Sequence, residues 1–207
     1  MNGNGLKLIA AFTMLVDHIG ALFFPDVLIL RIIGRISFPI FCFMVAEGCF
    51  YTKNMGLYLL RLFLFGLISQ IPYSLCFGAK LNVMFTLFCS ALIIGAFQRF
   101  NGSVVSLAVS VLILVLCGSL GLDYGVYGVS LVLVFYFLRA NRSASLAVSS
   151  GLTLVQSAVS PFQASALLSC IPLALYNGQR GKANLKYFFY IFYPAHLLLL
   201  GMIKAGL

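Results

Sequence analysis

The chain has 207 residues, of which 62% are hydrophobic and 8% charged, and its mean hydropathy is +1.09. This composition is far more apolar than that of water-soluble domains and excludes a soluble globular fold. The net charge of +9 does not indicate a nucleic-acid-binding face, because the basic residues are spread between apolar runs. We therefore predict a polytopic protein whose partner is the lipid bilayer and which binds no nucleic acid.

Nine apolar runs follow one another along the chain, separated by charged residues, Gly, Pro or Asn. Each bilayer crossing needs about 20 mostly apolar residues, so this length allows about nine crossings joined by short loops. The runs are residues 6–23, 27–50, 57–77, 82–98, 103–121, 125–138, 144–159, 163–176 and 187–204. We expect residues 1–207 to form a single all-α membrane domain, a bundle of about nine transmembrane helices.

Lys and Arg residues in the expected loops are concentrated on one side of this nine-helix arrangement. That side receives Lys7, Lys53, Arg99, Arg139, Arg142, Arg180, Lys182 and Lys186, and the other side receives Lys80 and Lys204. Because short cytoplasmic loops carry the excess of basic residues, the first side is predicted to be cytoplasmic. The N-terminus is then expected in the cytoplasm and the C-terminus outside it.

Ionisable side chains within the apolar runs are few, and each is a candidate functional residue because a charge in a membrane is costly. They are Asp17, His18, Arg31, Arg35, Glu47 and His196. At 1.5 Å of rise per residue, His18 lies about 16 Å beyond Lys7 and His196 about 15 Å beyond Lys186. Both histidines are therefore expected near the bilayer midplane, where they can share one cavity.

Asp17 and His18 are the residue types of a general-base pair, because a carboxylate can orient an imidazole and stabilise its charged form. Adjacent residues on a helix point about 100° apart, however, so direct contact is not assured. In the structural alternative, Asp17 pairs with Arg31 or Arg35 and holds two helices together. The two arginines can instead grip an anion, while Glu47 can face the cytoplasmic headgroups and His196 can hydrogen-bond across helices.

One loop combines glycines with positive charge. Residues 176–182 (YNGQRGK) include two glycines that permit tight turns, and Arg180 and Lys182 can contact phosphates. The positive-inside rule accounts for the same charges without any ligand.

Eight short motifs, in order, resemble the TraX family over nearly the whole chain. They are Lys7 to Gly20 (KLIAAFTMLVDHIG), Ile33 to Pro39 (IGRISFP), Glu47-Gly48 with Tyr51 to Asn54 (YTKN), Gln70 to Tyr73 (QIPY), Asn82 to Thr86 (NVMFT), Asp123 to Gly125 (DYG), Tyr176 to Gly178 (YNG) and Phe189 to His196 (FYIFYPAH).

The resemblance implies a bacterial inner-membrane acetyltransferase, since the family is named for the protein that acetylates the N-terminal amine of F-type conjugative pilin. The implied donor is acetyl-CoA. In the wider set of transmembrane acyltransferases a basic residue stands eleven positions before an essential histidine, and Lys7 and His18 have this spacing. The resemblance leaves the acceptor open between a peptide N-terminus, a glycan and a small molecule.

The residues and the resemblance together predict one mechanism. His18 acts as general base or transient acyl carrier with Asp17 beside it, and Arg35 or His196 stabilises the oxyanion. The predicted CoA-binding residues are Lys53, Arg61, Arg99, Asn177, Arg180 and Lys182. Further polar residues, with a substrate-binding or structural role, are Lys7, Arg31, Glu47, Asn82, Asp123 and Tyr124. No metal is expected.

Two other classes of protein remain as alternatives. Intramembrane Asp, His and Arg residues also mark the proton or solute paths of transporters, although no inverted repeat favours transport here. A non-catalytic assembly factor is the second alternative, and in such a protein the midplane histidine would be dispensable.

Overall fold

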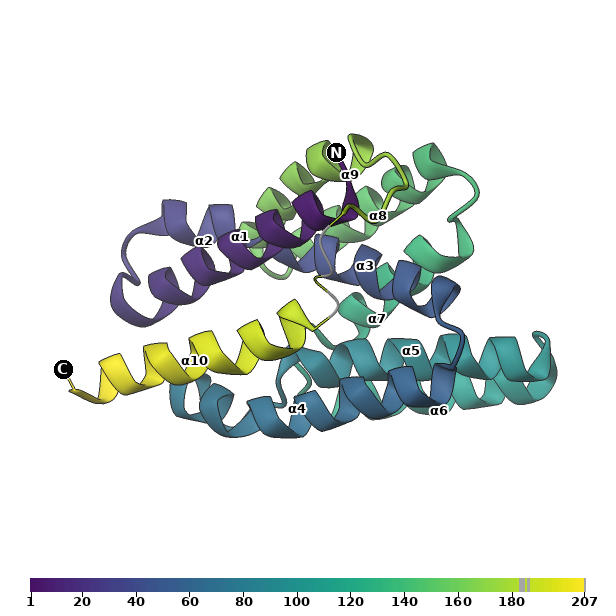
Figure 1. Ribbon diagram of the computed structural model, residues 1–207, viewed down its shortest axis with the longest axis horizontal. Helices are drawn as coiled ribbons and strands as arrows, with labels where there is room; N and C mark the ends of the chain where they lie inside the picture. Colours follow the sequence, from purple (N-terminus) through teal and green to yellow (C-terminus); the bar gives the residue numbers. More distant parts are fainter. Residues whose placement is uncertain (183–184, 186, 207) are drawn as a thin grey trace. The chain divides into compact units, whose positions relative to one another are not determined.

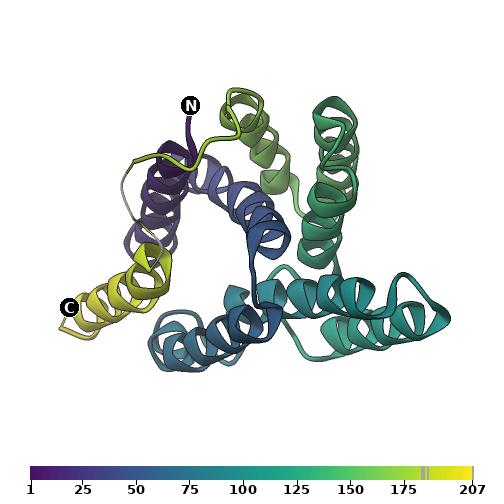
Figure 2. The ribbon, with the colours of Figure 1, turned by 45° about the vertical axis from the view of Figure 1, so that its right-hand side comes forward.

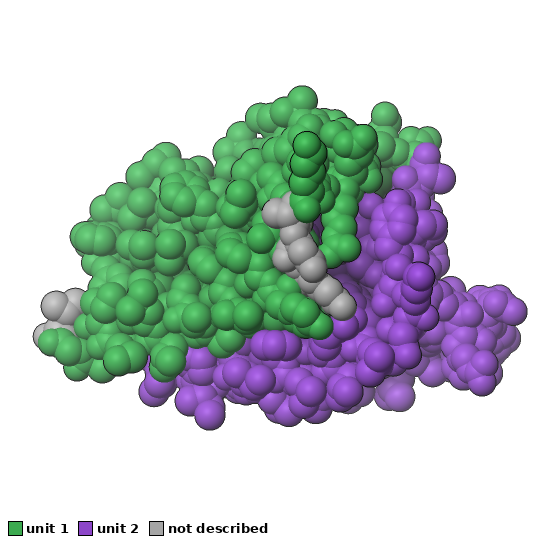
Figure 3. Space-filling model, in the orientation of Figure 1, with its two compact units in different colours: residues 1–41, 141–207 green, residues 42–140 purple. Residues whose placement is uncertain are grey.

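The structure is a computed structural model that describes residues 1–182, 185 and 187–206, so that Lys186 of the predicted cytoplasmic set lies outside the described residues. Its regular elements, in this part of the chain, are helices (Figure 1). They divide into two compact units, residues 1–41 with 141–207 (unit 1) and residues 42–140 (unit 2), coloured separately in Figure 3. The all-α class is confirmed, and the single domain stays a prediction.

Unit 1 contains both ends of the chain. Its helices are α1 (Gly3–Phe23), α2 (Leu28–Gly34), the first turn of α3 (Ser37–Tyr51), α8 (Arg142–Ser157), the 3-10 helix η1 (Pro161–Ser169), α9 (Cys170–Ala174) and α10 (Phe188–Gly206). Helix α1 contacts α2 on one side and α10 on another, and η1 packs on α8 and α2. Figure 2 shows α10 beside α1, so the first and last helices of the chain are neighbours.

Unit 2 is built around one central helix. It contains the rest of α3 together with α4 (Met55–Phe77), α5 (Val83–Phe100), α6 (Val104–Ser119) and α7 (Gly125–Phe137). Helix α5 contacts α4, α6 and α7. Its Ile93 is fully buried and packs in one cluster with Cys117, Leu122 and Val129. The apolar core of unit 2 therefore gathers on α5.

Asparagine side chains start four of the helices. Asn2, Asn54, Asn82 and Asn141 each accept a hydrogen bond from a backbone N–H of the first helical turn, at 2.9–3.0 Å. Such caps satisfy amides that have no partner inside the helix and are each worth about 1 kcal/mol. Polar residues at the edges of the apolar runs thus also define where helices begin.

All nine predicted apolar runs are helical in the structure. Two of them are divided: run 27–50 breaks at Arg35–Ile36 into α2 and α3, and run 163–176 forms η1 and α9. Five helical stretches are long and apolar enough to cross a membrane, namely Gly3–Phe23, Leu28–Tyr51, Met55–Phe77, Val83–Phe100 and Phe188–Gly206. These stretches indicate a membrane protein, while the count of nine crossings and the cytoplasmic N-terminus stay predictions.

Candidate functional site

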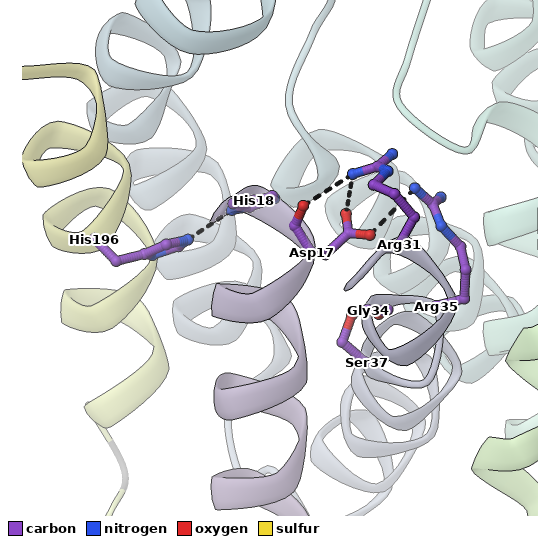
Figure 4. A network of polar contacts seen from close by, with 7 residues as sticks. All are labelled: Asp17, His18, Arg31, Gly34, Arg35, Ser37 and His196. Atoms are coloured by element: carbon purple, nitrogen blue, oxygen red, sulfur yellow. Dashed lines mark hydrogen bonds and ion pairs between the residues drawn. The ribbon is translucent and has the colours of Figure 1, made fainter. Parts of the chain in front are cut away.

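Three of the predicted site residues form a charged cluster in unit 1. Asp17 of α1 is buried, and its carboxylate accepts a 2.8 Å hydrogen bond from Arg31 of α2 and a 3.4 Å one from Arg35 (Figure 4). Arg31 also donates to the Asp17 backbone carbonyl at 3.0 Å. The alternative in which Asp17 pairs with Arg31 or Arg35 is therefore confirmed, and the carboxylate contacts both arginines. One carboxylate between two guanidinium groups leaves this cluster with a net charge of +1.

A glycine allows this close approach of α1 and α2. A Cβ atom placed on Gly34 would lie 2.2 Å from both Cβ and Oδ1 of Asp17, much closer than non-bonded atoms can come. The Gly34 carbonyl accepts a hydrogen bond from the Ser37 hydroxyl at 2.7 Å, at the junction between α2 and α3. Gly34 is therefore the contact point that lets Asp17 reach both arginines.

His18 faces away from this cluster and meets the second histidine of the chain. Its Nδ1 lies 2.8 Å from Nε2 of His196 on α10 (Figure 4). The ring planes are 2° apart and the ring centroids are 5.0 Å apart. That separation nearly equals the nitrogen distance plus the two ring radii, so the rings lie edge to edge in one plane rather than face to face. The shared site of the two histidines was predicted, and their direct hydrogen bond was not.

His196 is fixed by its own helix as well. It is buried, and its Nδ1 lies 2.7 Å from the backbone carbonyl oxygen of Phe192 one turn earlier. The Phe192 ring packs on the face of the imidazole, with centroids 4.7 Å apart and planes 13° apart. Both the position and the plane of the His196 ring are thus held from within α10. Phe192 is a neighbour that the sequence analysis missed, although it stands at i−4 in the FYIFYPAH motif.

Asp17 and His18 point in different directions, as expected for successive residues on a helix. The Asp17 carboxylate faces α2, whereas the His18 ring faces α10 (Figure 4). The role predicted for Asp17 in tuning His18 stays a prediction.

Helices α1 and α10 run parallel and in register. Lys7 donates from Nζ to the backbone carbonyl of Leu185 at 3.3 Å, and this pair has the same sequence separation as the two histidines. Eleven residues make about three turns of an α-helix, so Lys7 and His18 lie on the same face of α1. One face of α1 therefore carries a cation at one end and the imidazole further along.

Arg180 lies near the cationic end of this face. Its guanidinium is close enough to Lys7 for the two charges to interact. The loop that carries it is bound to the first residues of the chain, since the carbonyls of Gln179 and Arg180 accept hydrogen bonds from Gly3 and Asn4 at 2.7 and 3.1 Å. Two basic side chains are thus held together at the start of α1.

The remaining predicted CoA-binding residues are divided between the units. Lys53, Arg61 and Arg99 belong to unit 2, whereas Asn177 and Lys182 belong with Arg180 to unit 1. The Asn177 side chain accepts from the Gln179 backbone N–H at 3.1 Å and so shapes the loop. A phosphate site shared by all of these residues stays a prediction.

Glu47 forms an ion pair in unit 2. Its carboxylate accepts a 2.6 Å hydrogen bond from Arg139, whose guanidinium lies 3.7 Å from the centroid of the Phe50 ring. Arg139 also donates to the Tyr51 hydroxyl at 2.7 Å. The arrangement joins α3 to the end of α7, which is a structural role.

The other polar motifs of unit 2 form a second network. Asn82 is fully buried and donates to the Gly66 carbonyl at 2.8 Å and to the Gln70 side chain at 2.9 Å. The Asp123 carbonyl accepts a hydrogen bond from the buried Thr86 hydroxyl. Tyr124 has a left-handed backbone, with φ of 61°, immediately before α7. The QIPY, NVMFT and DYG motifs thus meet at one place, which sequence order alone did not predict.

Paired histidines also raise the question of a metal centre. Within residues 1–182, 185 and 187–206, no group of three or more His, Cys, Asp or Glu side chains is placed to hold a metal ion. The usual set of three or four protein ligands is therefore not supplied by the described residues.

One protein family and two known proteins are similar to this chain. The family model described as TraX protein matches residues 2–204. The chain is 33% identical to the probable fimbrial assembly protein FimC, serogroup H1, of Dichelobacter nodosus, over 94% of this chain and 92% of that protein. It is 28% identical to the uncharacterized protein RP591 of Rickettsia prowazekii (strain Madrid E), over 67% of this chain and 56% of that protein. No solved structure matches the chain significantly.

Proposed function

Because this chain belongs to the TraX family, we propose that it is a membrane-embedded acyltransferase that moves an acetyl group from acetyl-CoA to an amine or hydroxyl acceptor. The name of the Dichelobacter nodosus relative refers to fimbrial assembly and makes the N-terminal amine of a pilin-type subunit our first candidate acceptor. The bacterial inner membrane is the proposed location.

The observation that carries this proposal is the partly buried hydrogen bond between His18 and His196. A histidine held in this way can remove a proton from the acceptor amine or hydroxyl while that group attacks the thioester carbonyl carbon. The resulting tetrahedral oxyanion collapses, the carbon–sulfur bond breaks, and the imidazolium returns the proton to the CoA thiolate. Each turnover then yields acetylated acceptor and CoA, with His18 restored.

The net positive charge of the Asp17 cluster supports the same chemistry. A tetrahedral intermediate carries a negative oxygen, and fixed positive charge in a water-poor site stabilises it. The weaker 3.4 Å contact of Arg35 with Asp17 leaves Arg35 the better candidate to turn toward that oxygen, while Arg31 holds the carboxylate at 2.8 Å.

Lys7 and Arg180 are proposed to bind the phosphates of the donor. Lys7 lies about 16 Å along α1 from His18, a distance comparable to the reach of an extended phosphopantetheine arm. Because Lys7 and His18 share one face of the helix, the arm can follow that face and bring its thioester to the imidazole. Lys7 and Arg180 can form charge-assisted hydrogen bonds to phosphate, which favours this end of unit 1 as the phosphate site.

Donor binding gives a test that needs no knowledge of the acceptor. Calorimetry with acetyl-CoA and detergent-purified protein should show saturable binding that weakens about tenfold in Lys7→Gln, the loss expected for one charge-assisted contact of about 1.4 kcal/mol. Lys204→Gln removes the same charge from the far end of α10 and should bind as the wild type does. Absence of saturable binding to folded protein would refute the proposed function.

Turnover gives the second test. With acetyl-CoA and a short peptide that has a free N-terminal amine, wild-type protein should release CoA and acetylate the peptide in detergent, where no gradient can drive a transporter. His18→Gln should lose transfer and keep donor binding. A near-normal rate in the folded variant would exclude His18 as the base.

A further inference from the structure

We propose that His196 is a positioning residue that holds His18 as the tautomer protonated on Nδ1 and so makes Nε2 of His18 the catalytic base. This inference rests on the proposed acyl transfer for its consequence in catalysis. The tautomer assignment itself rests on the directions of two hydrogen bonds in unit 1.

The first hydrogen bond sets the proton on His196. A backbone carbonyl oxygen can only accept, so the contact of 2.7 Å with the Phe192 carbonyl requires that Nδ1 of His196 donates. A neutral imidazole has a single N–H, which places a lone pair on Nε2 of His196. The resting pair is neutral, because a charge on the buried His196 ring or on the partly buried His18 ring is costly, and two charges in contact would repel each other.

The second hydrogen bond then sets the proton on His18. Since Nε2 of His196 is the acceptor, Nδ1 of His18 must be the donor across the 2.8 Å contact. The coplanar, edge-to-edge rings aim this N–H along the line to the lone pair. The remaining nitrogen of His18, Nε2, therefore carries the lone pair that can take a proton from the acceptor.

The same arrangement stabilises the charged form of His18 during the reaction. When Nε2 takes up a proton, the existing bond from Nδ1 to His196 becomes charge-assisted and therefore stronger. The hydrogen-bond acceptor here is a neutral imidazole, whereas in Ser-His-Asp triads it is a carboxylate. A neutral partner avoids the cost of burying a second charge, and the Phe192 ring and carbonyl keep it in place.

A purely structural role makes a different prediction. If the histidine pair only joined α1 to α10, its loss would lower stability without changing the protonation of His18. The tautomer of His18 is therefore the decisive property.

The chain contains two histidines, so nitrogen-15 labelling of histidine gives spectra of these two rings alone. At neutral pH, wild-type protein should show both rings neutral and protonated on Nδ1. His196→Leu leaves one labelled ring, and His18 should then lose the enforced Nδ1–H form. A wild-type His18 protonated on Nε2, or one whose tautomer is the same in His196→Leu, would overturn the proposal.

His196→Gln is the matched variant, because its amide oxygen can still accept from Nδ1 of His18. It should keep the Nδ1–H tautomer and most of the activity, whereas His196→Leu should lower kcat about 100-fold or more with an unchanged KM for acetyl-CoA. If His196→Gln loses the Nδ1–H tautomer of His18 and keeps full activity, the proposed link between this tautomer and catalysis is contradicted. Wild-type protein that neither binds nor consumes acetyl-CoA would refute the proposed function. If His18 in that protein is still protonated on Nδ1, the tautomer assignment stands.

Discussion

Gly34→Ala is expected to separate α1 from α2 and to disrupt the charged cluster around Asp17. The added methyl group would lie 2.2 Å from Cβ of Asp17, so one of the two helices must move. Overpacking of this kind costs about 1–3 kcal/mol. The higher helix propensity of alanine offsets about 1 kcal/mol of that cost. Weakening of the two ion pairs adds to it, because both arginines then lose their buried carboxylate partner. We expect a net loss of about 2 kcal/mol.

The loss of stability in Gly34→Ala is measured by equilibrium unfolding in mixed detergent micelles with increasing dodecyl sulfate. The effect of the substitution on the site is measured by the release of CoA from acetyl-CoA. Gly151→Ala is the matched control, since Gly151 lies within α8 of the same unit and an added Cβ there would have no atom within 4 Å apart from the backbone of its own helix and its two chain neighbours. It should leave stability unchanged or raise it by up to about 1 kcal/mol. If Gly34→Ala unfolds at the same detergent fraction as Gly151→Ala, the argument from close packing is refuted.

Two further substitutions probe unit 2 by the same unfolding assay. Arg139→Lys should lower the free energy of unfolding by about 1 kcal/mol, because lysine keeps the charge near Glu47 and loses the planar contact with Phe50. An unchanged unfolding midpoint would show that the contact with Phe50 is not stabilising. Asn82→Asp should lower the free energy of unfolding by about 2–4 kcal/mol. Aspartate keeps the cap of α5 but places a carboxylate against two oxygen acceptors, the Gly66 carbonyl and the Gln70 side-chain oxygen. Equal stability of Asn82→Asp and wild type would rule out this buried network as a stabilising element.

The helices were predictable from the sequence because each apolar run is long and is separated from the next by polar residues. Two of those polar residues, Asn54 and Asn141, also cap α4 and α8. The division of run 27–50 was not predicted, since Ile33 to Ile36 contains no proline and reads as continuous helix. In the structure the Asp17 contact at Gly34 and the Ser37 hydrogen bond accompany this break, and both depend on tertiary packing.

The candidate site was predictable in part. Distance along the helices placed His18 and His196 at a common depth, and the cost of an isolated charge predicted a partner for Asp17. The in-plane bond between the histidines could not be derived, because it depends on the parallel register of α1 and α10. The Asn82 network also depends on contacts between helices distant in the sequence.

The pairing of α1 with α10 has a consequence for the time at which the histidine site forms. His18 is synthesised well before its partner His196, which follows it at a sequence separation of 178. The contact can form only after α10 has been inserted, whatever the order in which the intervening helices assemble. A nascent chain that has not yet inserted α10 would then hold Lys7 in place and leave the His18 imidazole without its partner. Insertion of α10 would itself be the step that completes the histidine pair.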